Sequence, residues 1–423
     1  MPAISRAMLL GALTSAGCGA AEGSAALSAP GPGSSERDPA ELARAPQVAQ
    51  GDRSATSCPA SLLHGEQQRE ARASRFVYAA NQNSHDVSAY SVEPSGALTA
   101  LGAPVRVGQY PQNLALLPNG KTLFVANRGS GTVSILSVDE TSGRLRAHGP
   151  EVADAGSSPV AIAVHPSGRL VFVGSDDSSF GAKNTVTAYA VAAGGSLTRV
   201  SAGETNSVGL LAMTLDASGK FLYTANALGD SVTAFHVDPC RGALEPLGQF
   251  ATAEFPVALS VGHSGELLYV ASSGGEPAVQ TFAIEAETGV LRLVQTLKTA
   301  LPAWSLRAMR LDAAGESLVV LSLGGRGSAF ISSFPLNANT GAPTRGLVSP
   351  LAAGDNASEI ALGPAGRFAY VGNFGSNDVA AYALDAAHGA VKHLGSVAAG
   401  TAPSALAIAT GPRLAGSPTA ALQ

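Results

Sequence analysis

The sequence predicts an all-β protein that folds as a seven-bladed β-propeller. One unit of sequence occurs seven times between Phe76 and Leu394, and each copy contains two strand-like segments separated by turns. Its period of 46 to 51 residues is too long for a helical pair or a single hairpin. That period suits four strands of about five or six residues with their turns, which together make one propeller blade.

The units align on the residue that ends their most apolar strand. We call these seven positions the anchor residues; they are Asn81, Asn127, Ser175, Asn226, Ser272, Ser322 and Asn373. The following strand, such as Val133–Leu136 or Val186–Tyr189, places β-branched and aromatic residues beside small polar ones. A half-buried pleated surface favours this mixture, so both segments are predicted to be strands.

Two turns recur at fixed places in the unit, and both contain glycine. The first turn precedes the anchor strand, with Gly120, Gly168, Gly219, Gly265, Gly315 and Gly366. The second turn follows the next strand, with Gly96, Gly143, Gly195, Gly242, Gly289, Gly341 and Gly389. Glycine reaches positive φ without a steric penalty, so each repeated glycine predicts a tight hairpin.

The ends of the repeat region predict how the ring closes. The first unit starts at Arg75 with no opening strand of its own, whereas Ala402–Thr410 matches the opening strand of a unit and has no unit after it. We therefore expect residues 75–410 to form the propeller, with the C-terminal strand completing the first blade. Closure of this kind leaves no unpaired strand edge where the ring's two ends meet.

Composition agrees with a large β domain and argues against nucleic acid as a partner. Of the 423 residues, 45% are hydrophobic and 13% are charged. A net charge of −5, a pI near 5.9 and the lack of any Lys/Arg cluster give no basic face for phosphates. No apolar stretch reaches the roughly 18 residues that a membrane-spanning helix needs.

Residues 1–18 resemble a bacterial lipoprotein signal peptide. Ala7–Leu13 is a short apolar core, and small residues lead to Cys18, with Ser15 where this signal usually has leucine. The pattern predicts export and lipidation of Cys18, so that the lipid is the only expected contact with a membrane. Gly19 after the cysteine favours the outer membrane of the cell envelope, as in enteric lipoproteins. The alternative is ordinary cleavage before the cysteine, which gives a periplasmic or secreted protein.

The segments that flank the propeller are predicted to be disordered. Residues 19–74 are rich in Ala, Gly, Ser and Pro and form a tether, and residues 411–423 form a short tail. With Cys18 lipidated, Cys58 in the tether and Cys240 in the fourth unit remain. Two independent thiols are the simpler interpretation, while an oxidising compartment would allow a disulfide between them.

The repeated strand and turn resemble one propeller family in particular. WD repeats would need a Trp in each blade, and Trp304 is the only one in the chain. Pro111–Asn127, Pro159–Ser175 and Pro256–Ser272 share an opening proline, an apolar strand, a Ser-Gly or Asn-Gly turn and a second apolar strand. This pattern resembles the seven-bladed lactonase family, which includes bacterial 6-phosphogluconolactonase and the YVTN-repeat surface proteins. The resemblance covers about residues 75–410 and implies the fold more strongly than the activity.

The residues that the resemblance implies for catalysis are missing from the best-matching blade. In 6-phosphogluconolactonase-like members, a Gly-Pro-Arg-His sequence opens an inner strand, and a Glu follows the anchor Asn. An Arg and a His suit the binding of an anionic lactone and the activation of water. Leu211, Ala212 and Ala227 stand at these positions here, so no catalytic residue is predicted.

Other blades place polar residues at the same register or directly after an anchor residue. The residues predicted to bind a ligand are Gln112, Asn113, Arg307, Glu359 and Arg128, and Ser404 holds this register in the closing strand. Together they would form a polar mouth of the central channel. Arg307 and Glu359 lie on neighbouring inner strands, and we expect them to be close to each other. A hydrated rim with no particular ligand is the alternative.

No metal or cofactor is predicted. His85, His165 and His263 lie in loops or turns at different registers and share no metal-ligand spacing. We interpret His165 and His263 as surface turn residues, and Asp139 and Asp238 as residues that form the second turn.

Two functions from different classes therefore remain. The favoured one is an exported, lipid-anchored propeller that binds a protein, a glycan or a small molecule at the channel mouth. The alternative is a lactone hydrolase with a rearranged active site at the central channel. Export argues against 6-phosphogluconolactone as the substrate, because that intermediate belongs to cytoplasmic metabolism.

Overall fold

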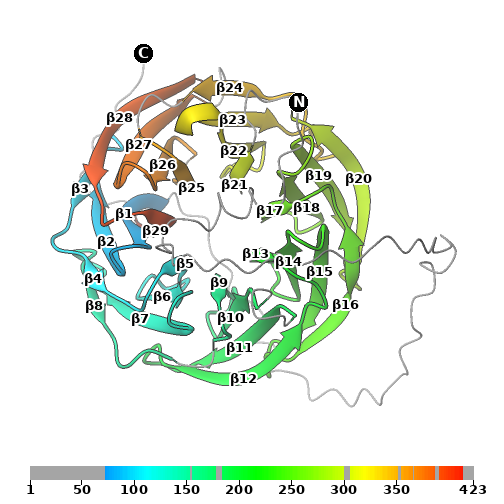
Figure 1. Cartoon of the computed structure of the whole chain (residues 1–423), viewed down its shortest axis with the longest axis horizontal. Coiled ribbons are helices and arrows are strands. Elements are labelled where there is room, and N and C mark those ends of the chain that lie inside the picture. The colour runs from blue at the N-terminus through cyan, green and yellow to red at the C-terminus, as the bar shows by residue number, and fades with distance from the viewer. Residues whose placement is uncertain are drawn as a thin grey trace, which may run out of the picture.

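The computed structural model describes residues 72–412 except 153–154, 178–182, 300–304, 351–353, 365 and 386–389. In this part of the chain, seven antiparallel sheets surround a central axis as blades (Figure 1). The predicted seven-bladed β-propeller is therefore confirmed. The predicted signal peptide, the tether up to residue 71 and the tail beyond residue 412 lie outside the described residues. No helix among the described residues is long and apolar enough to cross a membrane.

Each blade runs outward from an inner strand that faces the axis. The first blade contains β29 (Pro403–Pro412), β1 (Arg72–Asn81), β2 (Asp86–Val92), β3 (Leu98–Ala100) and the short β4 (Val105–Arg106). Blades two to four contain β5 (Pro111–Leu116), β6 (Thr122–Asn127), β7 (Thr132–Val138), β8 (Leu145–Ala147); β9 (Pro159–Val164), β10 (Leu170–Ser175), β11 (Thr185–Val191), β12 (Leu197–Glu204); and β13 (Leu210–Leu215), β14 (Phe221–Asn226), β15 (Ser231–Val237), β16 (Leu244–Ala251). Blades five to seven contain β17 (Pro256–Val261), β18 (Leu267–Ser272), β19 (Ala278–Ile284), β20 (Leu291–Lys298); β21 (Ser305–Leu311), β22 (Ser317–Leu323), β23 (Ala329–Pro335), β24 (Leu347–Pro350); and β25 (Ala357–Leu362), β26 (Phe368–Asn373), β27 (Asp378–Asp385), β28 (Ala390–Ala398).

The C-terminal strand closes the ring as predicted. β29 pairs antiparallel with β1, from Arg72 opposite Pro412 to Asn81 opposite Pro403. In Figure 1 the red end of the chain lies beside its blue beginning within one blade. The pairing also extends the strands a few residues beyond the predicted limits at 75 and 410.

The four asparagines among the anchor residues hold the loop between the second and third strands of their blades. All seven anchor residues have no exposed surface. The Nδ2 of Asn81 donates to Asp86 Oδ1 at 2.8 Å and to Ser88 Oγ at 2.9 Å, and Asn127 bonds Thr132 and Ser134 in the same way. The repeated Asn is therefore a structural residue that satisfies polar groups inside the blade.

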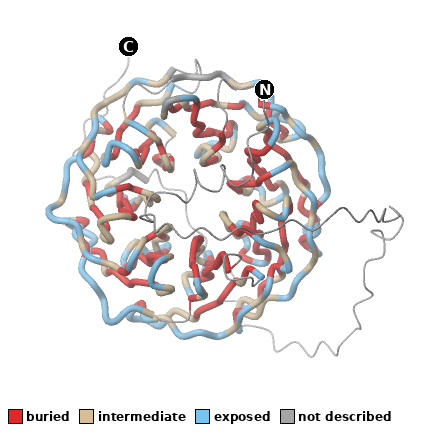
Figure 2. The backbone as a smooth tube through the Cα atoms, in the orientation of Figure 1, coloured by how far each residue is buried: buried red, intermediate tan, exposed pale blue. Residues whose placement is uncertain are grey.

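Tyrosines in the second strands join neighbouring blades. The hydroxyls of Tyr78, Tyr223 and Tyr269 donate to the carbonyl oxygens of a second-turn glycine in the next blade, at 3.1, 3.1 and 2.8 Å; these glycines are Gly143, Gly289 and Gly341. Their rings are buried in the apolar clusters between blades. Figure 2 shows the same distribution, with buried residues on the strands nearer the axis and exposed residues along the outer rim.

The second-turn glycines have a packing role in addition to their predicted turn conformation. Gly143 has φ +70°, as a tight turn requires. A Cβ at Gly143 would also overlap the ring of Phe76 in the preceding blade. A Cβ at Gly289 would overlap the ring of Phe221 in the same way. A Cβ at Gly96 would overlap the ring of Phe368, where the seventh blade meets the first. These positions therefore need glycine for the contact between blades as well as for φ.

Two expectations about single residues are wrong. His165 is only 4% exposed, because the first turns of the third and fourth blades pack together and place Gly219 against its ring. Burial lowers the pKa of His165. Cys240 is disulfide-bonded, so it is not an independent thiol, and the other two cysteines of the chain lie outside the described residues. His263 is exposed as expected.

We predict that Gly143→Ala destabilises the protein more than Gly120→Ala. Both glycines have positive φ, so both substitutions strain the backbone, but a Cβ at Gly120 meets nothing within 4 Å. The clash with Phe76 should add about 1–3 kcal/mol to the loss in the free energy of unfolding. Urea unfolding of the two variants measures the difference. Equal losses would show that the glycine serves only the turn.

Candidate functional site

A central cavity of about 700 Å³ lies between the inner strands of the seven blades. Every inner strand begins with a β-bulge, where one residue has no partner opposite it in the second strand. A bulge redirects the side chain of its extra residue. All seven bulge residues line the cavity: Ser404, Gln112, Val160, Leu211, Val257, Arg307 and Ser358.

The residues predicted at a common register occupy two successive positions of their inner strands. Gln112, Arg307 and Ser404 occupy equivalent bulge positions in their blades. In the seventh blade this position belongs to Ser358, and Glu359 follows it. Glu359 is thus the counterpart of Asn113 in the second blade, and both line the cavity.

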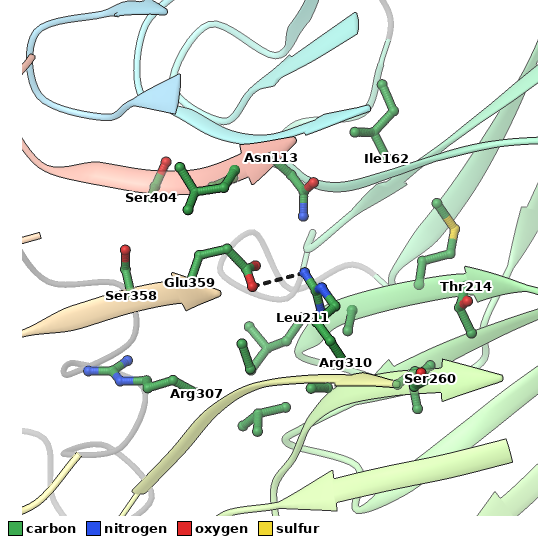
Figure 3. Close-up of a pocket in the computed structure, with 18 of the residues that line it drawn as sticks. Asn113, Ile162, Leu211, Thr214, Ser260, Arg307, Arg310, Ser358, Glu359 and Ser404 are labelled. Carbon is green, nitrogen blue, oxygen red and sulfur yellow. Dashed lines mark hydrogen bonds and ion pairs between the residues drawn. The ribbon is translucent and has the colours of Figure 1, made fainter. Parts of the chain in front are cut away.

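The cavity has a polar wall and an apolar wall. Blades six, seven, one and two contribute the polar wall, which we define as Arg307, Arg310, Ser358, Glu359, Ser404, Gln112 and Asn113. Blades three to five contribute the apolar wall, which we define as Val160, Ile162, Leu211, Met213, Val257 and Leu259. Thr214 and Ser260 are hydroxyl-bearing exceptions on the apolar side (Figure 3).

Arg310, not Arg307, pairs with Glu359. Arg310 Nη2 lies 2.8 Å from Glu359 Oε1, which joins β21 to β25. Figure 3 shows this contact as a dashed line and shows Arg307 pointing elsewhere. The expected proximity of Arg307 and Glu359 is wrong because the bulge at Arg307 resets the alternation of side chains along β21. Arg310, three residues later, then has the direction and the reach to meet the carboxylate.

The two side chains of this ion pair differ in burial, and the burial of Glu359 changes the pKa of its carboxyl group. The Glu359 side chain is 15% exposed and that of Arg310 is 38% exposed. Burial raises the pKa of Glu359, while the charge of Arg310 and the N–H of Ile360, 2.8 Å from Oε1, oppose this rise. Burial also lowers the pKa of Arg307 to about 10, so its guanidinium remains charged at neutral pH. The polar wall therefore carries two cations and one carboxyl group with a raised pKa.

Several other polar residues at this site connect blades. Gln112 Oε1 accepts a hydrogen bond from Gln82 Nε2 of the first blade at 2.8 Å. The hydroxyl of Ser404 donates to Pro111 O at 2.8 Å, and that of Ser358 donates to Pro403 O at 2.6 Å. The two serine bonds run from one inner strand to the next, and all three bonds join neighbouring blades.

The structure does not place Arg128 with the other predicted ligand-binding residues. Its Nε donates to Ser158 Oγ at 3.2 Å, which links the second blade to the third. It is absent from the described lining of the cavity. Conversely, the sequence pattern did not identify Arg310, which lies three residues beyond the predicted register. A second arginine three residues after Arg307 on the same predicted strand was the signal that could have identified it.

The described residues offer no ready metal site. Within the described ranges, no group of three or more His, Cys, Asp and Glu side chains is arranged to hold a metal ion.

Comparisons with known proteins agree with the fold. The curated 6-phosphogluconolactonase of Erwinia tasmaniensis is 26% identical over 237 residues, which are 52% of this chain and 67% of that protein. The chain spans between 26% and 68% of the lengths of the curated relatives it matches. A putative 6-phosphogluconolactonase structure from Bacteroides fragilis has a TM-score of 0.69 at 17% identity and covers 80% of this chain and 98% of its own. The periplasmic gluconolactonase of Pseudomonas aeruginosa has a TM-score of 0.67 at 23% identity and covers 79% and 98%.

A family model shows the relationship directly. The model described as "Lactonase, 7-bladed beta-propeller" matches residues 69–160, 148–261 and 347–416, which together exceed half of the chain. The chain therefore belongs to the lactonase family of seven-bladed β-propellers.

Proposed function

We propose that this protein binds a small hydroxylated carboxylate, of the chemical class of the sugar acids, in the central cavity. The observation that carries the proposal is the Arg310–Glu359 pair on a polar wall that faces an apolar wall across about 700 Å³. Cavities of roughly 300–1,000 Å³ hold small molecules in most proteins. The apolar wall suits the carbon–hydrogen face of a sugar ring or chain, and the amides of Gln112 and Asn113 suit its hydroxyl groups.

The charges of the lining favour an anionic ligand. Arg307, Arg310 and Glu359 are charged side chains in the lining, and two of the three are cations. A ligand carboxylate could accept paired hydrogen bonds from a guanidinium, which are among the stronger polar contacts in proteins. Because burial already disfavours the charged form of Glu359, an incoming carboxylate can replace it as the partner of Arg310.

Hydrolysis of a sugar lactone is a second candidate function at the same site. A buried carboxyl group with a raised pKa beside a cation is a candidate general base. The Glu359 carboxylate would take a proton from water as the water oxygen attacks the lactone carbonyl, and Arg310 would stabilise the oxyanion. The ring C–O bond then breaks, and the released alkoxide takes up the proton to give the hydroxy acid. Relatives named 6-phosphogluconolactonase and gluconolactonase support this candidate.

We also propose that the protein is exported and anchored by a lipid on Cys18. The support is the sequence of residues 1–18, which lies outside the described residues, together with the similarity to the periplasmic gluconolactonase of Pseudomonas aeruginosa. An exported protein would meet unphosphorylated sugar acids and lactones. The binding module would then act at the cell envelope, outside the cytoplasm.

We predict that D-gluconate binds the purified protein and that Arg310→Met weakens this binding about tenfold or more. Loss of a charge-assisted hydrogen bond typically costs about 1.5–3 kcal/mol, which corresponds to this range. Isothermal titration calorimetry gives the two dissociation constants, and Met213→Leu on the apolar wall is the matched control. An unchanged affinity in Arg310→Met would contradict the proposed site.

A second experiment distinguishes binding from hydrolysis. Base consumption at constant pH measures the opening of glucono-δ-lactone above its spontaneous rate. If the second candidate is right, Glu359→Gln should lower the catalysed rate by a factor of about 100 or more, as loss of a general base does. A rate at the spontaneous level in the wild-type protein would leave binding as the function.

We predict that the stability of the wild-type protein falls relative to Glu359→Gln as pH rises above 4.5, the ordinary pKa of Glu. The pKa of Glu359 is raised in the folded state, so its protonated form stabilises the fold at low pH. That contribution is lost as pH rises through the raised pKa. Urea unfolding of both proteins between pH 4 and pH 8 measures the difference. A difference that grows in favour of the wild type with rising pH would show that the attraction of Arg310 outweighs burial.

We predict that Cys18→Ser moves the protein from the membrane fraction to the soluble fraction of the producing bacterium. A lipidated cysteine anchors the mature chain, and serine cannot accept the lipid. Immunoblotting of separated envelope and soluble fractions tests this. Identical partitioning of the two forms would indicate an ordinary secreted protein.

A further inference from the structure

The central cavity extends further along blades four and five than along the other blades. Its lining there continues from the inner strand into the first turn, as far as Ala217 in blade four and His263 in blade five. In the other five blades, the described lining at this end stops within the inner strand. We call this extension the axial arm and define it by Thr214, Leu215, Ala217, Ser260, Val261 and His263. Residues 183–299 are described without a gap, so the strands and turns that form the arm are complete.

One strand position in the arm is polar in three consecutive blades. It lies three residues after the bulge and is occupied by Thr214, Ser260 and Arg310 in blades four, five and six. The other four blades have alanine at this position: Ala115, Ala163, Ala361 and Ala407. Hydrogen-bonding side chains therefore replace alanine where the arm lies and on the blade beside it.

The two hydroxyl groups of the arm have capacity for a ligand. Thr214 and Ser260 are half-buried and line the cavity. The Thr214 hydroxyl donates a long hydrogen bond of 3.4 Å to Leu215 O, and a hydroxyl can also accept hydrogen bonds through its oxygen. Leu215 and Val261 supply apolar surface next to these hydroxyls. This combination suits a sugar ring, which has hydroxyl groups at its edge and carbon–hydrogen bonds on its faces.

The cavity is too large for a single six-carbon acid. Each non-hydrogen atom of gluconate needs no more than the share of a water molecule, about 30 Å³, so gluconate fills roughly half of the 700 Å³. The cavity is also long, because β17 advances about 13 Å between Val257 and Val261 and the lining continues beyond it to His263. A longer ligand would use the space that gluconate leaves.

The position of the ion pair shows where such a ligand has room to extend. Figure 3 shows Thr214 and Ser260 on the opposite side of Arg310 from Glu359. A ligand carboxylate held by Arg310 would therefore lie at the start of the axial arm. The arm, as defined, contains no Asp, Glu, Lys or Arg, so the part of the ligand that enters it is uncharged.

We propose that the ligand of the central cavity is a disaccharide acid, which is a sugar acid that carries a second sugar ring on one of its hydroxyl groups. Its carboxylate pairs with Arg310, and its second ring lies in the axial arm between Thr214 and Ser260. This inference rests on the proposed function, because it assigns a longer ligand to the same site. It makes Thr214 and Ser260 the residues that determine the preferred length.

Lactobionate, a gluconate that carries a galactose ring, is the probe that tests the proposal. In isothermal titration calorimetry, lactobionate should bind the wild-type protein at least tenfold more tightly than D-gluconate. Lactose, which has two rings and no carboxylate, should bind at least tenfold more weakly than lactobionate. Lactobionate affinity equal to or lower than that of gluconate would overturn the proposal.

Filling the arm gives the second test. Ser260→Leu places an apolar side chain in the arm and should weaken lactobionate binding at least tenfold, while gluconate binding changes less than threefold. Ser264→Leu is the matched control, because Ser264 is exposed in the next turn and is absent from the described lining. A lactobionate affinity that Ser260→Leu leaves unchanged would place the second ring elsewhere and refute the arm as its site.

A smaller change keeps the proposal testable if Ser260→Leu fails to fold. Thr214→Val removes one hydroxyl and preserves the shape of the side chain, and it should weaken lactobionate binding severalfold with less effect on gluconate. Equal effects on the two acids would contradict a contact with the second ring.

The same titrations distinguish this inference from the proposed function. Gluconate binding that depends on Arg310, without any gain from the second ring, would overturn the inference and leave the proposed function intact. Absence of binding by both acids would overturn both.

Discussion

The contact between neighbouring blades is the constraint on which the rest of this structure depends. A four-stranded sheet cannot bury both of its faces alone, so each blade relies on the next for its core. The second-turn glycine permits that approach, because a side chain at Gly143 or Gly96 would collide with the ring it covers. The tyrosine hydroxyls then bond the same turns. Contacts of this kind set the angle between blades, and that angle sets the diameter of the central cavity.

The cavity takes much of its chemistry from the bulge positions of the inner strands. The bulge residues point inward and are free to differ between blades, from Leu211 to Arg307. Their neighbours in the strand pair with the second strand and are small or apolar, except Asn113 and Glu359. This division explains how a repeated scaffold can have a polar wall beside an apolar wall. It also explains why membership of the lactonase family constrains the fold far more than the ligand.

Much of the architecture was predictable from the sequence, whereas the details of the site were not. The period and the repeated glycine turns predicted seven blades. The strand at Ala402–Thr410, which matches the opening strand of a unit but has no unit after it, predicted how the ring closes. The partner of Glu359 was predicted wrongly, since a bulge changes which side of a strand each later residue faces. The burial of His165 could not be predicted from its neighbours in the sequence either, because a turn of the adjacent blade covers it.

Closure by the last strand also affects the order in which the protein can fold. Ser404 bonds the carbonyl oxygen of Ala80, a residue 324 positions earlier, so the first blade lacks its inner strand until almost the whole chain is available. Contacts between such distant segments form slowly, because a long loop must close before they contribute any stability. During that interval the inner edge of β1 presents unpaired backbone groups that another chain's strand could join. The newly made protein is therefore most exposed to aggregation at its first blade, and that exposure ends when β29 pairs with β1.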